Sequence, residues 1–443
     1  MIPNPPWVSF DQKHVWHPYT QMKTAPPPIP IARADGVYLY TPDGRKLLDG
    51  ISSWWVNIHG HNHPRLNRAL SAQADKLSQV VFAGLSHEPG ARLAHALASR
   101  APGQLPHVFY SDDGSTAVEV GMKMAYQYWH NRGEIQRTLF VGLTQAYHGD
   151  TFGTMAAGDA SVFHGVFRDV LFTVERVHAP HCQRCPVGRS WPGCGVACID
   201  TLRETIRRCG DRIAAVLIEP MLQGAGGMLV WPAEFLRQVR QITQDAGILL
   251  IADEVLTGFG RTGAMFACEH GPIAPDILCL SKAITGGYLP LGATLATEAV
   301  YEAFLSGARQ RTLFHGHSYT GNALACALGL ESLALLEENR CIERVARLER
   351  LFQTRLRDLA TLSVVRDTRC IGGVAAVELH GEGGYLAEVG PILTRRFHER
   401  GILLRPLGNV VYFMPPYAIS DEEAGWVLDV MAEELDALDP KHA

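Results

Sequence analysis

Two short apolar runs near the middle of the chain constrain the fold more than any other feature. Residues 248–253 read ILLIAD, and residues 276–280 read DILCL. Each run is too short for a buried helix and is bounded by turn residues, which favours two buried strands of a parallel sheet. Open α/β sheets form their binding sites at the carboxyl ends of their strands. The sequence therefore predicts that Asp253 and Lys282 lie together at one edge of such a sheet.

The chemistry of this pair depends on its surroundings. A lysine just past a buried strand can be partly desolvated, which lowers its pKa and makes it a nucleophile toward carbonyl groups. A carboxylate beside it is what a pyridinium nitrogen requires. The plainer interpretation is a strand-end Asp253 that forms a salt bridge with a surface Lys282. The residues alone leave both interpretations open.

The composition limits the function classes. The chain has 443 residues, of which 47% are hydrophobic and 19% charged, as expected for a soluble globular protein of two or three domains. A net charge of −5 and the absence of basic runs argue against a nucleic-acid or membrane-surface partner. No apolar segment is long enough to span a bilayer. The first residues do not resemble a secretion signal, so we expect a cytoplasmic protein.

A second candidate site follows the predicted strand HVFYSD. Gly114 and Ser115 open a helical pattern directly after this strand. A helix N-terminus offers free backbone N–H groups and the positive end of the helix dipole, which suit a phosphate group. An ordinary helix cap would use the same residue types. Placed beside the predicted Asp253–Lys282 pair, the turn is interpreted as a phosphate site.

Three aromatic residues are candidates for the walls of a pocket. Tyr147 follows the predicted strand over residues 138–143 and can lie flat on an aromatic ring. Trp54 and Trp55 are adjacent in a segment that we expect to be extended, so their side chains should point to opposite faces. Simple packing is the alternative for both tryptophans.

Four of the ten cysteines gather in one Gly- and Pro-rich stretch. They are Cys182, Cys185, Cys194 and Cys198. Clustered thiolates of this kind can hold a structural Zn²⁺ ion or an iron–sulfur cluster. The alternative is four unrelated thiols in a loop, and ten cysteines in a chain of this size are typical of cytosolic thiols. The sequence leaves the choice open.

The chain after about residue 335 differs in character. Residues 341–360 have the pattern of an amphipathic helix, and later strands with a final helix from Ser420 predict a separate α+β domain. Arg405 ends one of these strands and could bind a carboxylate with both of its terminal nitrogens, or form a surface ion pair. We predict an N-terminal arm and hairpin over residues 1–60, a large domain over 61–333 and a C-terminal small domain over 334–443.

The run IADEVLTGFGRTG, followed by a lysine one strand later, resembles the class III aminotransferases of fold type I, which use pyridoxal phosphate. The resemblance extends over nearly the whole chain. It implies an α/β fold in which the large, cofactor-binding domain has a mainly parallel seven-stranded sheet flanked by helices, next to a smaller α+β domain. It also implies a homodimer with shared active sites.

The resemblance assigns roles to the candidate residues. Lys282 would bind the cofactor covalently and carry the proton during the reaction, and Asp253 would keep the ring nitrogen protonated. Gly114 and Ser115 would hold the phosphate, and Ser318 would cap it from the neighbouring subunit. Tyr147 would cover one face of the ring, with Trp54, Gly316 and the catalytic Tyr19 at the substrate. Arg405 would bind the substrate carboxylate.

Within the family, the stretches HVWHPYTQM and DGISSWWVNIHGHNHP resemble one branch. That branch transfers the amino group of S-adenosylmethionine to 8-amino-7-oxononanoate in biotin biosynthesis. Two alternatives remain within the family: an ω-aminotransferase for other amines, and a synthase of diaminononanoate that uses lysine as donor. A cofactor-free relative that serves as a scaffold or a metal-binding protein is the alternative from another class.

Overall fold

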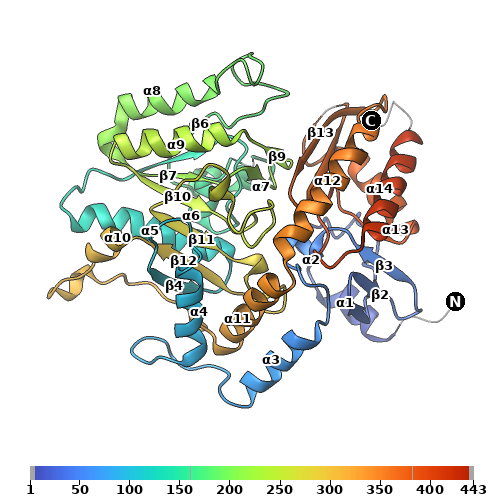
Figure 1. Ribbon diagram of the computed structural model, residues 1–443, viewed down its shortest axis with the longest axis horizontal. Helices are drawn as coiled ribbons and strands as arrows, with labels where there is room; N and C mark the ends of the chain where they lie inside the picture. Colours follow the sequence, from blue (N-terminus) through green and yellow to red (C-terminus); the bar gives the residue numbers. More distant parts are fainter. Residues whose placement is uncertain (1–4, 160, 382, 439–443) are drawn as a thin grey trace.

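The computed structural model describes residues 5–159, 161–381 and 383–438. Figure 1 shows two parts side by side, a larger part around a central sheet and a smaller part at the right. The central sheet has seven strands in the order β4-β12-β11-β10-β7-β5-β6. Their bounds are β4 His107–Ser111, β5 Leu139–Leu143, β6 Val174–Val177, β7 Ile213–Ile218, β10 Leu249–Asp253, β11 Ile277–Leu280 and β12 Gly292–Ala296.

The central sheet is mainly parallel, as predicted. β10 pairs in parallel with β7 and β11, and β5 pairs in parallel with β6 and β7, whereas β12 runs antiparallel to its neighbours β11 and β4. Every residue of β5, β7, β10, β11 and β12 is buried. Burial on both faces explains why these strands are continuous apolar runs instead of alternating patterns.

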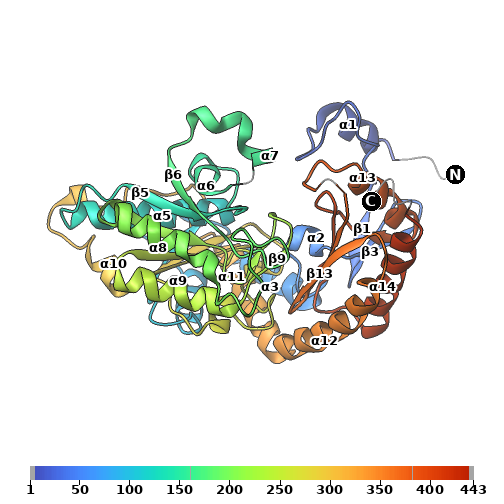
Figure 2. The same ribbon diagram turned by 90° about the horizontal axis from the view of Figure 1, so that it is seen from above.

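Helices flank this sheet on the outside. α5 packs along β4, β7, β10, β11 and β12, and α11 packs against α3 and α4. Figures 1 and 2 both show α8 and α9 lying next to each other against the sheet. The helices of the larger part are α3 Pro64–Ala74, α4 Glu88–Ala98, α5 Gly114–Asn131, α6 Phe152–Ala157, α7 Ser161–His164, α8 Asp200–Cys209, α9 Ala233–Asp245, α10 Glu298–Glu302 and α11 Ala323–Glu338. The short hairpin β8 Leu222–Gln223 and β9 Leu229–Val230 follows β7.

The smaller part combines both ends of the chain. One sheet has the order β13-β14-β16, and another has the order β1-β2-β3-β15, in which β15 runs parallel to β3. The predicted N-terminal hairpin therefore completes the C-terminal part. Its elements are α1 Trp7–His14, β1 Arg33–Asp35, β2 Tyr38–Tyr40, β3 Lys46–Asp49, α12 Cys341–Leu359, β13 Val365–Ile371, β14 Val374–Leu379, α13 Val389–Glu399, β15 Ile402–Leu403, β16 Val410–Phe413 and α14 Asp421–Asp436.

Three local features of the described chain bear on its predicted organisation. The N-terminal arm contains the helix α1. Two helices, α3 and α4, follow the arm and hairpin and are separated by a loop. The predicted boundary between residues 333 and 334 lies within α11, and the domain bounds stay a prediction. None of the described helices is long and apolar enough to cross a membrane.

The segment with the two tryptophans is a tight turn, α2 (Ser52–Trp55), and is not extended as expected. Trp54 and Trp55 have φ of 71° and 74°, in the left-handed region that residues other than glycine rarely adopt. The Asp49 carboxylate stabilises the turn by accepting the Ser53 backbone N–H at 2.9 Å and the Ser53 hydroxyl at 2.7 Å. The buried Asp49 carboxylate thus holds the segment in a turn instead of the expected extended conformation.

Candidate active site

Lys282 lies at the centre of a cavity of about 670 Å³ at the carboxyl ends of β10 and β11. Asp253 is the last residue of β10 and pairs in register with Cys279 of β11, three residues before the lysine. Burial lowers the pKa of Lys282, and the charges of Asp253 and Glu219 offset this only in part. The lysine can therefore hold its amine neutral more readily than a solvated lysine, which is the state that attacks carbonyl carbon.

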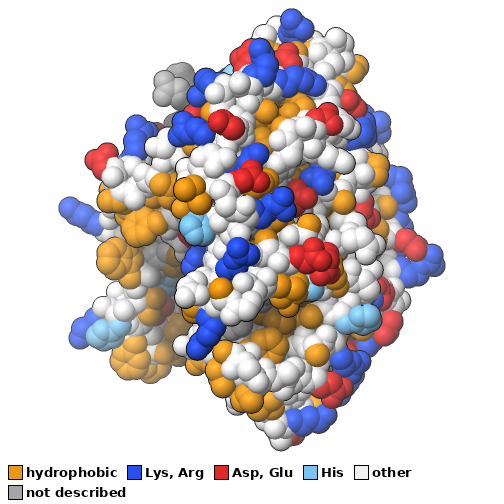
Figure 3. Space-filling view, turned by 90° about the vertical axis from the view of Figure 1, so that its left-hand side faces the viewer, with side chains coloured by type: hydrophobic (Ala, Val, Ile, Leu, Met, Phe, Trp, Pro, Cys, Tyr) orange, Lys and Arg blue, Asp and Glu red, His pale blue; other side chains and the backbone are white. Residues whose placement is uncertain are grey.

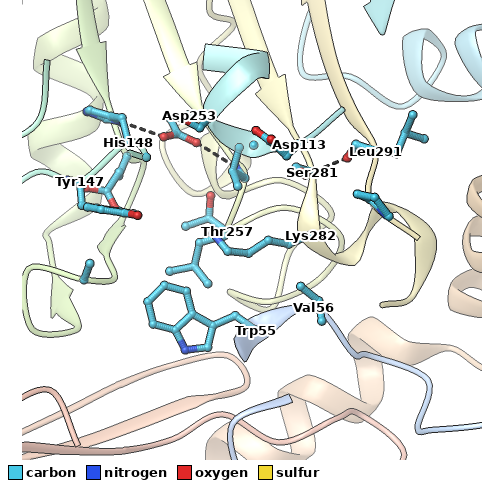
Figure 4. Close-up of a pocket in the computed structure, with 18 of the residues that line it drawn as sticks. Trp55, Val56, Asp113, Tyr147, His148, Asp253, Thr257, Ser281, Lys282 and Leu291 are labelled. Atoms are coloured by element: carbon cyan, nitrogen blue, oxygen red, sulfur yellow. Dashed lines mark hydrogen bonds and ion pairs between the residues drawn. The ribbon is translucent and has the colours of Figure 1, made fainter. Parts of the chain in front are cut away.

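Asp253 is held by two hydrogen bonds. Nδ1 of His148 lies 2.7 Å from one carboxylate oxygen, and the backbone N–H of Val255 donates to the other at 3.0 Å. Asp253 and His148 are both buried. Figure 4 shows the His148–Asp253 contact on one side of Lys282 and Trp55 on the other. The carboxylate is thus fixed in one orientation toward the cavity.

Glu219, at the end of β7, is a second buried carboxylate of the cavity. It accepts the backbone N–H of Tyr147 at 2.9 Å and that of Gly224 at 3.2 Å. Burial raises the pKa of Glu219 to about 7, with the Asp253 charge adding to the increase and His148 opposing it. Glu219 therefore ties the Tyr147 loop to the glycine-rich turn after β7.

Tyr147 meets the N-terminal arm at the edge of the cavity. The Tyr19 hydroxyl donates to Asp150 at 2.5 Å and lies 3.0 Å from the Tyr147 hydroxyl. Burial, followed by contacts with neighbouring oxygens, raises the pKa of both tyrosines, so both stay neutral. Nε2 of His164 lies 3.5 Å from the other Asp150 oxygen. Tyr19 and Asp150 are 131 positions apart, so the fold brings together what the sequence separates.

The predicted phosphate site lies at the N-terminus of α5. Gly114 and Ser115 both line the cavity, and Asp113 caps the helix by accepting the Thr116 N–H at 2.8 Å. A Cβ atom at Gly114 would lie 2.5 Å from a methyl group of Val255, so only glycine fits there. The Ser115 hydroxyl is within 2.9 Å of two threonine hydroxyls, which holds its side chain in place. The glycine and the helix terminus form a cradle for an anion.

The two tryptophans have different positions. Trp55 is buried, lines the cavity, and lies with its ring centroid 5.2 Å from Nζ of Lys282. Trp54 is more exposed and packs edge-on against Tyr19 at 5.4 Å between ring centroids. The guanidinium carbon of Arg405 lies 4.6 Å from the centroid of the Trp54 ring, and Nη2 of Arg405 donates to the Tyr385 hydroxyl at 3.1 Å. Tyr19, Trp54 and Arg405 therefore form one group, and their roles toward a substrate stay a prediction.

Five predicted site residues do not line this cavity. Tyr19, Trp54 and Arg405 form their group beside it, and two others, Gly316 and Ser318, lie away from it within one chain. Gly316 and Ser318 are both exposed, and neither lines the cavity. The backbone carbonyl of Ser318 accepts from the Gln79 side chain at 3.1 Å. This placement leaves the capping role of Ser318 a prediction about a neighbouring subunit.

Three further residues of the site, His148, Glu219 and Tyr385, are not predicted by the sequence analysis. His148 contacts Asp253, Glu219 accepts the backbone N–H of Tyr147, and Tyr385 accepts from Arg405. Trp55, a candidate for a pocket wall, lines the cavity. Glu219 alone carried a usable signal, because a carboxylate ending a wholly apolar strand is buried unless the strand lies at an edge.

The structure gives the metal hypothesis for the cysteine loop no support. Cys182, Cys185, Cys194 and Cys198 are all free thiols. Burial, together with the neighbouring sulfur atoms, raises the pKa of Cys182, and that of Cys198 to about 11. Within the described residues, no three His, Cys, Asp or Glu side chains lie where they could hold a metal ion.

The residues of the cavity fit pyridoxal phosphate. The cavity presents a desolvated amine at Lys282, a fixed carboxylate at Asp253 and a glycine cradle at Gly114, which match the aldehyde, ring nitrogen and phosphate of that molecule. With the fold, this donor set defines a pyridoxal-phosphate-dependent transaminase of fold type I.

Comparison with known families is consistent with this class. The family model described as Aminotransferase class-III matches residues 19–435. The chain belongs to the class III aminotransferase family.

Several relatives are similar over nearly the whole chain. Two curated proteins named adenosylmethionine-8-amino-7-oxononanoate aminotransferase are 44% identical (Geobacter sulfurreducens, 96% of both chains covered) and 46% identical (Synechococcus elongatus, 96% of this chain and 99% of the relative). The crystal structure of the enzyme of that name from Methanocaldococcus jannaschii has a TM-score of 0.92 at 36% identity, covering 98% and 99% of the two chains. An amine transaminase from an uncultivated Pseudomonas species, in its PLP-bound internal aldimine form, has a TM-score of 0.89 at 34% identity, covering 96% and 98%.

Proposed function

We propose that this chain transfers the amino group of S-adenosyl-L-methionine to 8-amino-7-oxononanoate and thereby makes 7,8-diaminononanoate for biotin synthesis. The near full-length curated relatives of that name support the proposal. The structural observation that carries it is the group of Tyr19, Trp54 and Arg405, in which a guanidinium group lies over an aromatic ring. A long apolar chain with a terminal carboxylate needs both parts of this group.

Lys282 is proposed to do the proton transfer. Pyridoxal phosphate, when bound, supplies an aldehyde that takes up the amino group and a ring that withdraws electrons. The buried Lys282 amine, with its lowered pKa, can accept a proton from the donor carbon that bears the amino group. It can then give this proton to the carbon on the other side of the same nitrogen. Asp253 holds the proton on the ring nitrogen, and His148 keeps the Asp253 carboxylate in the orientation that this requires.

The remaining contacts position the reactants. Gly114 and Ser115 hold the phosphate at the α5 N-terminus, and Tyr147 covers the ring from the loop that Glu219 fixes. Asp150 supplies a negative charge at the edge of the cavity, where a donor bearing positive charge would enter. Because one cavity contains Lys282, donor and acceptor use it in turn, which gives a ping-pong scheme.

We also propose a homodimer in which Ser318 caps the phosphate of the partner subunit. Ser318 is exposed, and large hydrophobic side chains are exposed in the same stretch and around α7. These are Phe152, Val162, Val166, Phe167, Val170, Leu305, Phe314 and Tyr319. The face of the larger part in Figure 3 carries several groups of exposed hydrophobic side chains. Apolar surface of this extent marks protein–protein interfaces.

A cytoplasmic location is proposed as well. All ten cysteines are free thiols, which is the state that a reducing compartment maintains.

The identity of the amino donor distinguishes the proposed activity from its alternatives. Cofactor-loaded protein is mixed with one candidate donor at a time, and loss of the cofactor's absorbance band is followed in a single half-reaction. We expect S-adenosylmethionine to discharge the band, and lysine and simple ω-amines to do so at least a hundredfold more slowly. Faster reaction with lysine would identify the lysine-using alternative, and faster reaction with ω-amines a general ω-aminotransferase.

A further inference from the structure

A second cavity, of about 420 Å³, lies between the two parts of the chain. The larger part contributes Gln145, Arg184 from the cysteine-rich loop, and the turn at residues 225–227, whereas the smaller part contributes side chains of β13, β14 and the segment after β15. Ala225 lines both this cavity and the one that contains Lys282. The two cavities are therefore neighbours at the glycine-rich turn.

Three arginines of this cavity converge on one buried carboxylate. The Glu378 side chain is 2% exposed and forms ion pairs with Arg184 and, at 2.7 Å, with Arg369. Nη1 of Arg369 also lies 2.8 Å from the buried Asp367 carboxylate. The third arginine, Arg366, is 4.0 Å from Glu378 at its nearest nitrogen.

The arginines carry more charge than these acids neutralise. Arg184, Arg366 and Arg369 supply three positive charges, against two negative charges from Glu378 and Asp367. Burial raises the pKa of Glu378, but its bonds to Arg369 and Arg184 outweigh this and hold the pKa below its usual value, so this acid stays charged. One positive charge is left over, and Arg366 is the arginine that pairs least closely.

A buried donor in the same wall also lacks a partner. The Arg369 side chain is 9% exposed, and its Nε has no hydrogen-bond partner within the described residues. Its other nitrogens are used, since Nη1 bonds the two acids and Nη2 donates to the Gly227 carbonyl at 2.9 Å. An unsatisfied donor on a buried charged group costs free energy unless a ligand or water accepts from it.

We propose that this cavity is a binding site for a small anion with a carboxylate or phosphate group. Guanidinium groups bind both groups through paired N–H donors, and the excess positive charge of the three arginines that line the cavity favours an added anion. The volume is in the range of small-molecule sites and exceeds what a bare phosphate ion fills. Because both parts of the chain form its walls, a bound anion bridges them.

The anion cavity is distinct from the cavity of Lys282 but lies next to the substrate group. Tyr385 lines the anion cavity, and its hydroxyl accepts the hydrogen bond from Arg405. Anion binding in this cavity can be measured without the amino donor or acceptor, so it is independent of their identity.

The test uses cofactor-loaded protein, in which the phosphate cradle at Gly114 is already filled. Inorganic phosphate and succinate are titrated separately by calorimetry, at constant ionic strength in a buffer free of other phosphates and carboxylates. We expect saturable binding of at least one probe, with one site per chain. Arg366→Gln should weaken this binding by about ten- to a hundredfold, because a charge-assisted contact is lost.

Two control variants locate the site. Arg207→Gln removes an exposed arginine on α8 and should leave binding unchanged. Arg405→Gln, in the substrate group, should also leave the affinity unchanged. Binding of phosphate alone would identify a phosphate-bearing ligand, and binding of succinate alone a carboxylate ligand. The proposal is overturned if neither probe saturates, if Arg366→Gln binds like wild type, or if Arg405→Gln abolishes binding.

Discussion

Nδ1 of His148 lies 2.7 Å from Oδ2 of Asp253, and both side chains are buried. A charged carboxylate can only accept, so the histidine nitrogen is the donor in this bond. The bond fixes the acid that we propose to hold a proton on the ring nitrogen in the cavity of Lys282. We therefore expect His148 to be a positioning residue that acts through Asp253.

Removing His148 should impair the reaction without unfolding the protein. A hydrogen bond to a charged group is worth about 1.5–3 kcal/mol, so we expect His148→Ala to lower kcat and cofactor affinity by about ten- to a hundredfold. Steady-state kinetics and cofactor titration measure the two effects. His130→Ala, at an exposed position on α5, is the control. Wild-type kinetics in His148→Ala would show that Asp253 needs no such support.

Asp253→Asn keeps the shape of the side chain but not its charge. The variant can still accept the Val255 N–H, which donates at 3.0 Å in the wild type, so the fold should be retained. It cannot hold the ring proton, and we expect kcat to fall at least a hundredfold while circular dichroism stays unchanged. Turnover within a few-fold of wild type would mean that another group does this work.

Arg405→Ala should affect the two substrates unequally. The proposed oxo-acid acceptor loses a charge-assisted bond, worth about ten- to a hundredfold in KM, whereas the donor amine reacts at Lys282 and should change little. Kinetics with each substrate varied in turn measure the difference. Tyr385→Phe removes only the hydroxyl that Arg405 bonds and should give a smaller change of the same kind. Arg400→Ala, at an exposed ion pair, is the control. Equal changes for both substrates would contradict the role of Arg405.

Glu219 should make stability depend on pH. Its pKa in the folded protein, about 7, is above the usual value of 4.5, so the folded state keeps a proton that the unfolded chain releases between these values. The contribution of Glu219 to the free energy of unfolding is therefore fully present below pH 4.5 and is lost as the pH rises through 7. The total loss is of the order of 3 kcal/mol. Glu219→Gln cannot titrate.

Thermal unfolding of the cofactor-free protein at pH 5 and pH 8 measures this effect. We expect the midpoint of Glu219→Gln, relative to wild type, to be higher at pH 8 than at pH 5. An unchanged difference between the two pH values would mean that Glu219 is charged in the folded state throughout this range.

The sequence predicted the parts of the site that local patterns determine. Asp253 and Lys282 follow apolar strands, and Gly114 opens a helix after another, so the rule that sites form at strand ends was sufficient. The order of the seven strands and the boundaries of α3 and α4 depend on tertiary packing, which the pattern alone does not specify.

The contacts made over long sequence separations could not be predicted in the same way. The Tyr19–Asp150 bond and the Trp55–Lys282 contact each join distant segments through the docking of the N-terminal arm and the α2 turn. The left-handed backbone at α2 buries Trp55 beside the lysine and leaves Trp54 next to Tyr19 and Arg405. The sequence pattern does not indicate this left-handed turn, because none of the residues of α2 is glycine.

The most direct test of the account is to find which lysine carries the cofactor. Cofactor-loaded protein is reduced with borohydride, digested, and mapped by mass spectrometry, with Lys282→Ala treated in parallel. We predict one modified lysine per chain, at Lys282, and none in the variant. Modification of a different lysine, or of none in the loaded wild type, would contradict the claim that the buried amine beside Asp253 is the reaction centre.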